Sequence, residues 1–132
     1  MEVQPSRFRD KLEEQFVAIR EVMDRVHIPD APMGYPKASS LIIASLALAH
    51  GLKATVHLRT TDYSYVGFLN QIYGAYLLGI DRVLLLRGDP PYRGSIINDV
   101  SPEEGMRVIR SDDRLGGIKV GFILSLRYPL EK

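Results

Sequence analysis

The sequence predicts an α/β domain built on a parallel sheet. Short apolar segments begin near residues 26, 55, 83 and 120, and each gap between them holds a segment with helical spacing. Strand–helix units of roughly 30 residues are typical of right-handed crossovers between parallel strands. The segment 83–86 reads Val-Leu-Leu-Leu, as strands buried on both faces often do. The length of 132 residues predicts a single domain over 1–132.

The first half of this pattern has clear boundaries. Apolar residues at helical spacing, with charges between them, predict an amphipathic helix over about 7–23. A short strand follows at 26–28. A second, almost wholly apolar helix is expected over 41–50, with Ser39 or Ser40 as its cap and Gly51 just past its end.

The second half repeats the order of strand and helix. After a strand at 54–58, one of residues 60–62 is expected to cap a third helix that ends at Gly79. Behind the strand at 83–86, Ser101 is followed by proline and two glutamates, which predicts the start of a fourth helix. A last strand is expected over 120–126.

Composition excludes several classes of function. A net charge of +1 gives no broad attraction for nucleic acid or for an anionic membrane, so neither partner is expected. The absence of cysteine excludes disulfides and thiolate metal sites, and no spacing of histidines and carboxylates predicts a metal. The longest apolar run is far below the roughly 20 residues of a membrane span, and the first residues do not form a signal peptide. We therefore expect a cytoplasmic protein.

Polar residues follow each predicted strand. They are Asp30 after the first strand, "RTTD" at 59–62 after the second, "RGD" at 87–89 after the third, and Arg127 with Tyr128 after the fourth. Because ligands of parallel α/β folds bind at the carboxyl ends of the strands, these groups predict one shared site. The alternative is that they are ordinary polar loops. His57, inside a strand, fits either a ligand contact or a core histidine bonded to backbone.

Several segments, in order, resemble the methylenetetrahydrofolate reductase family. The most specific is "GIDRVLLLRGDPP" at 79–91, which resembles the fourth-strand signature of that family. "TVHLRTTD" at 55–62 is similar to its third strand, where the family has a histidine in an A-H-L-T-type segment. "DRVHIPDAPMG" at 24–34 resembles the second strand, "EVQPSR" at 2–7 resembles the motif that closes the first, and "RYPLEK" at 127–132 resembles the tyrosine–proline after the fifth.

The resemblance implies a cofactor and roles for particular residues. Members hold FAD, with FMN as a second possibility here, and reduce methylenetetrahydrofolate to methyltetrahydrofolate. Carried across, Glu2 would be the general acid and Asp89 would lie near the flavin ring and tune it. The implied cofactor-binding residues are His57, Thr60, Arg87, Gly88, Asp89 and Tyr128. Arg87 would act as a fixed planar cation near the phosphates or the ribityl chain.

The resemblance also implies a (β/α)8 TIM-type barrel, of which this chain would form about half. A complete barrel takes about 250 residues. Half a barrel has unpaired strand edges and an open sheet face, so we expect a homo-oligomer or a second half-barrel subunit. The alternative architecture is a flattened open sheet covered by its helices.

Three functions follow as hypotheses. The first is a flavin-dependent oxidoreductase of folate one-carbon metabolism, acting on a folate or other pterin, or the flavin-binding part of such an enzyme. The second is a non-catalytic nucleotide-binding, flavin-binding or regulatory subunit. The third is an unrelated α/β binder of a phosphate ligand.

Overall fold

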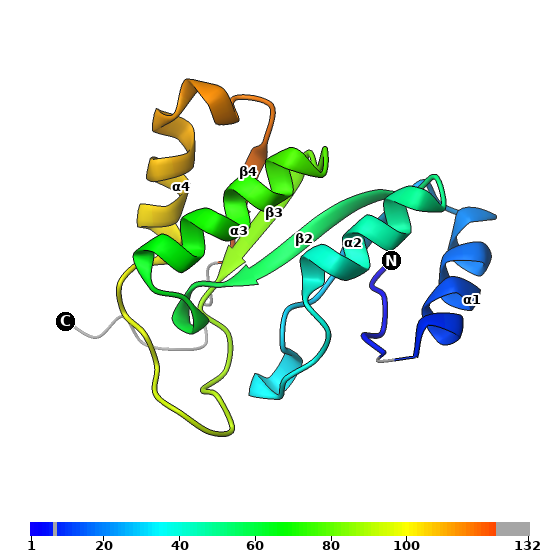
Figure 1. The fold of residues 1–132 in the computed structure, drawn as a ribbon, viewed down its shortest axis with the longest axis horizontal. Helices are drawn as coiled ribbons and strands as arrows, with labels where there is room; N and C mark the ends of the chain where they lie inside the picture. Colours follow the sequence, from blue (N-terminus) through cyan, green and yellow to red (C-terminus); the bar gives the residue numbers. More distant parts are fainter. Residues whose placement is uncertain (7, 124–132) are drawn as a thin grey trace.

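The computed structural model describes residues 1–6 and 8–123, whose centre is a parallel sheet (Figure 1). Its strands lie in chain order: β1 (Arg25–Ile28), β2 (Lys53–Arg59), β3 (Arg82–Leu86) and β4 (Lys119–Phe122). The first residues extend the sheet beyond β1, where the Val3 N–H donates to the His27 carbonyl at 2.9 Å. The predicted α/β fold, with parallel units arranged as in part of a TIM-type (β/α)8 barrel, is confirmed.

Three helices connect the strands, a fourth helix precedes β1, and three 3₁₀ turns follow strand or helix ends. The helices are α1 (Arg9–Arg20), α2 (Ser40–Ala49), α3 (Tyr65–Leu77) and α4 (Pro102–Ser111), and the turns are η1 (Pro32–Gly34), η2 (Thr60–Asp62) and η3 (Asp113–Leu115). Helix α1 ends three residues before its predicted end. The Val22 and Met23 N–H groups both donate to the Ile19 carbonyl, which closes a turn into β1. Its predicted first residue, at 7, lies outside the described residues.

One predicted helix cap is wrong and another is confirmed. The cap of α3 is Ser64, whose Oγ accepts the Gly67 N–H at 3.1 Å, while residues 60–62 form η2 instead. At α4 the Ser101 Oγ accepts the Glu104 N–H, and the Glu104 carboxylate accepts the Ser101 N–H. This reciprocal box is the one that the serine–proline–glutamate pattern predicted. Strand β4 ends at Phe122, and the predicted continuation over 124–126 lies beyond the described residues.

The sheet has one face in the core and one face away from it. The alternating residues that face the helices are fully or almost fully buried: Val26, Ile28, Val56, Leu58, Val83 and Leu85. In Figure 1, α2 and α3 lie along this face. The opposite face carries His27, His57 and Leu84, which are only half-buried. In a closed (β/α)8 barrel this second face would form the interior.

Candidate functional site at the carboxyl edge of the sheet

The loops that leave β1, β2 and β3 meet at one buried arginine. Arg59, the last residue of β2, is 1% exposed. Its Nε donates to the Asp62 carboxylate at 2.8 Å, its Nη1 to the Ala31 carbonyl at 3.0 Å, and its Nη2 to the Asp89 carbonyl at 2.6 Å. Its backbone N–H donates to Asp30 Oδ2 at 3.0 Å. Three of the four polar strand ends are therefore joined by direct hydrogen bonds.

A second bond holds the turn after β3 to the turn after β2. The Thr61 hydroxyl donates to the Arg87 carbonyl at 2.6 Å. Between the two anchored carbonyls, Gly88 adopts φ +75°, in the left-handed region. A Cβ at this position would lie 3.1 Å from three side-chain atoms of Arg59, so glycine gives both the conformation and the close approach.

The loop after β1 packs directly on the loop after β3. Gly34 has φ +77°, and its backbone lies so close to Pro90 that an added Cβ would be 2.1 Å from the Pro90 carbonyl oxygen. The Tyr92 N–H donates to the Gly34 carbonyl at 3.1 Å. The rings of Tyr35 and Tyr92 stack with centroids 5.2 Å apart. The loops that follow β1 and β3 are therefore held together at this edge, and the ribbon shows them below the ends of β2 and β3 (Figure 1).

Two ionisable side chains beneath these loops, Asp30 and Tyr63, are largely removed from water. Burial raises the pKa of the Asp30 carboxyl above its ordinary value, and the N–H bond from Arg59 partly opposes that shift. Burial also raises the pKa of Tyr63, which has Asp30 and Asp62 as neighbouring charges. The guanidinium of Arg59 therefore bonds to one carboxylate and two carbonyls, while the Arg59 backbone N–H bonds to the second carboxylate, that of Asp30.

The predicted cofactor-binding residues of this edge differ in exposure. The side chains of Arg87 and Asp89 are exposed, while their carbonyls accept the bonds described above. Thr60 is 1% exposed, and its hydroxyl has no hydrogen-bond partner among the residues that the structure describes. A buried hydroxyl without a partner is costly and marks a place where a ligand or a water can bind. Tyr128, the remaining predicted residue, lies outside the described residues.

His57 lies on the open face of the sheet, where it contacts a second histidine. Its Nε2 is 3.1 Å from Nδ1 of His27, and the two rings meet edge to face. Glu2, the predicted general acid, pairs with His27 through the backbone and is exposed. Glu2, His27 and His57 thus form a row across neighbouring strands, apart from the loop contacts at Arg59.

The histidine pair predicts a pH dependence of stability. Burial lowers the pKa of both His27 and His57. A folded-state pKa below the ordinary value of about 6.5 means that the unfolded chain binds more protons. The pair's contribution is therefore present above that pH and is lost as the pH falls through the lower folded values. In urea unfolding at pH 7 and pH 5, the double variant His27→Gln with His57→Gln should lose less stability on acidification than the wild type. An unchanged loss would contradict the assignment.

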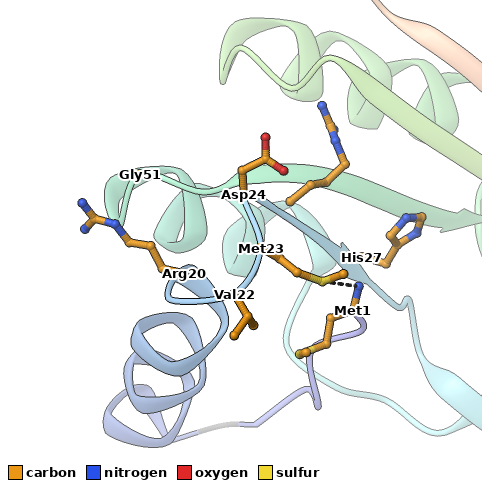
Figure 2. Close-up of a pocket in the computed structure, with 8 residues that line it drawn as sticks. Met1, Arg20, Val22, Met23, Asp24, His27 and Gly51 are labelled. Atoms are coloured by element: carbon orange, nitrogen blue, oxygen red, sulfur yellow. Dashed lines mark hydrogen bonds between the residues drawn. The ribbon is translucent and has the colours of Figure 1, made fainter.

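A hollow at the other end of the sheet is a poorer candidate for a ligand. It is lined by Met1, Arg20, Val22, Met23, Asp24, Arg25, His27 and Gly51 (Figure 2). It lies at the amino end of β1, whereas ligands of parallel α/β folds bind at carboxyl ends. Its cation Arg25 already donates two bonds to Asp81, at 2.8 and 2.7 Å. The amino group of Met1 points to the Met23 sulfur, 3.7 Å away.

Sequence reasoning missed two residues of these clusters. Arg59 was grouped with the polar strand ends but was given no binding role. Asp62, three positions later, was the feature of the sequence that could have indicated its ion pair. His27 was given no role, although it lies in the strand before that of His57. Over residues 1–6 and 8–123, no group of three or more histidine, cysteine or carboxylate side chains is arranged to hold a metal ion. No helix in this part of the chain has the length and apolar character to cross a membrane.

Comparison with known protein families shows to which family the chain belongs. The profile of the family described as methylenetetrahydrofolate reductase matches residues 1–111, up to the last residue of α4. The chain belongs to the methylenetetrahydrofolate reductase family. Its family is one of folate-related oxidoreductases that generally depend on a flavin. Among curated proteins, no sequence matches the chain.

The edge described above fits the flavin of a methylenetetrahydrofolate reductase in its chemistry. Flavin nucleotides carry phosphate and hydroxyl groups, which need cations and hydrogen-bonding groups. Arg87 offers an exposed guanidinium, Thr60 an unused buried hydroxyl, and Gly88 a backbone without a Cβ.

Proposed function

We propose that this member of the methylenetetrahydrofolate reductase family binds a flavin, FAD or FMN, at the carboxyl edge of β2 and β3. The observation that carries the proposal is the anchored turn at 87–89. The turn is fixed through its carbonyls, so the side chains of Arg87 and Asp89 remain free for a ligand. The family match supports a flavin as that ligand, because members of the family generally depend on one.

The residues would act on the bound flavin in distinct ways. Arg87 would pair with the phosphates or hold the ribityl chain, and Thr60 would bond to a polar atom of the ligand. Asp89 would place a negative charge near the ring system, which disfavours added electron density there. When bound, the flavin would supply hydride transfer to a folate or other pterin substrate.

The exposure of Glu2 bears on whether the protein carries out catalytic turnover. A general acid that works near neutral pH needs a buried environment, and Glu2 is exposed in the chain as described. This observation favours the alternative of a flavin-binding or regulatory subunit that does not itself reduce methylenetetrahydrofolate. We propose that association with a second copy or a second half-barrel subunit, across the unpaired strand edges, would cover Glu2, which lies beside β1 at one of these edges.

Flavin binding is tested by titrating the purified protein into FAD or FMN and following the quenching of flavin fluorescence. Replacing Arg87 with glutamine should weaken affinity about 10-fold or more, as expected for a lost charge-assisted hydrogen bond. Arg93→Gln is the matched control, because Arg93 is an exposed arginine of the same loop. It should change affinity less than about 2-fold. Absence of quenching in the wild type, or equal effects of both variants, would reject the site.

Turnover is tested separately on the flavin-loaded protein. The flavin is reduced without oxygen and then mixed with methylenetetrahydrofolate. Reoxidation with formation of methyltetrahydrofolate would establish the enzyme. Binding without reoxidation would support the non-catalytic alternative.

A further inference from the structure

Arg59 is the most extensively bonded buried polar side chain that the described residues contain, and no ligand-binding role falls to it. It is among the largest fully buried side chains of the protein. Each of its three guanidinium nitrogens donates a hydrogen bond, to partners from three different loops. A buried arginine is expensive to desolvate, so a position that keeps one calls for a reason beyond packing.

The geometry of the turn at 87–89 supplies that reason. The carbonyl of Asp89 accepts from Arg59, and the carbonyl of Arg87 accepts from Thr61. Both peptide oxygens therefore face the protein interior, which directs the side chains of Arg87 and Asp89 to the surface. Without the guanidinium, nothing else among the described contacts would hold the Asp89 carbonyl in place.

We infer that Arg59 is a positioning residue that fixes the turn at 87–89, and through it the loop at 87–97, in its ligand-binding form without touching the ligand. The part of this inference that concerns flavin rests on the proposed function. A lysine cannot replace Arg59, because one ammonium cannot reach Asp62, Ala31 and Asp89 with the fixed fork of a guanidinium.

The chain offers a matched control for the substitution Arg59→Lys. Arg25 also forms a two-bond ion pair with an aspartate, Asp81, but at the amino end of the same sheet. It also donates to the Ala54 carbonyl at 3.3 Å. Arg25→Lys therefore repeats the chemical change of Arg59→Lys at a place that has no contact with the turn.

The experiment measures amide hydrogen exchange and flavin affinity on the same variants. The informative amides are Tyr92 and Ile97, whose N–H groups donate to the Gly34 and Thr61 carbonyls across the loop. Arg59→Lys should raise exchange at both amides about 10-fold or more and weaken flavin binding by a similar factor, as for the loss of one charge-assisted bond. Arg25→Lys should change neither by more than about 2-fold, even if it lowers overall stability.

The outcomes separate the two proposals. Thr61→Val removes only the hydrogen bond from Thr61 to the Arg87 carbonyl and should also raise amide exchange at Tyr92 and Ile97. This variant tests the anchoring of the turn if Arg59→Lys does not fold. Unchanged exchange in the folded variants, or equal changes in Arg25→Lys, would overturn the inference. If the wild type binds neither FAD nor FMN, the proposed function fails, while the exchange data still decide whether Arg59 fixes the turn.

Discussion

Replacing Asp62 with alanine is expected to lower the free energy of unfolding by about 3 kcal/mol. The change leaves the Arg59 guanidinium, 2% exposed in its side chain, without its carboxylate partner. Breaking a buried pair from one side costs about 3–5 kcal/mol, because the remaining charge stays desolvated. The lower end applies here, since the Asp62 side chain is 30% exposed. Urea unfolding followed by circular dichroism measures the loss.

The control for Asp62→Ala is an ion pair of similar geometry at the surface. Arg9 and Glu13 also approach to 2.8 Å, but the arginine side chain is 71% exposed. Glu13→Ala should cost less than about 1 kcal/mol, as exposed pairs usually do. A loss for Asp62→Ala no larger than that of Glu13→Ala would show that water reaches Arg59 and that the loops are not tied through a buried cation.

The second large effect is expected at Gly34. Gly34→Ala should lower the free energy of unfolding by about 3 kcal/mol or displace the loop at 87–97. Its φ of +77° costs an L-residue about 1–2 kcal/mol, and the new Cβ would meet the Pro90 carbonyl oxygen at 2.1 Å. Loss of the Tyr35–Tyr92 stack would accompany the displacement and can be followed by tyrosine fluorescence.

Gly79 offers an internal control for Gly34. It has the same φ of +77° but nothing within 4 Å of the position of an added Cβ. Gly79→Ala should therefore show the conformational cost alone, about 1–2 kcal/mol. Equal losses for the two variants would mean that the two loops separate freely and that their contact contributes nothing to the site.

Local and periodic signals were sufficient for the framework of the fold. The apolar strand at 83–86 and the serine–proline–glutamate start at Ser101 act within a few residues of their own position, and the structure has both. The cap of α3 could not be predicted in the same way. Thr61 and Asp62 have good capping side chains, but both are used in bonds to Arg87 and Arg59, so the next available hydroxyl, Ser64, caps the helix.

The candidate site could be predicted only in part for a related reason. Polar residues after each strand correctly indicated that Asp30, Asp62 and Asp89 lie at one edge. Their partners depend on which loops touch, and that is decided by tertiary contacts such as the approach of Gly34 to Pro90. A charged residue such as Arg59, at the end of a strand, reads as exposed in the sequence, and only the three surrounding loops bury it.

We propose that the carboxyl edge of β2 and β3 is the flavin site. Titration of the ¹⁵N-labelled protein with FAD, followed by amide chemical shifts, tests it most directly. We predict shift changes centred on Thr60, Gly88 and Asp89, with none at Met23 and Gly51 in the hollow at the amino end of β1. Changes centred on that hollow, or no changes at saturating FAD, would contradict it.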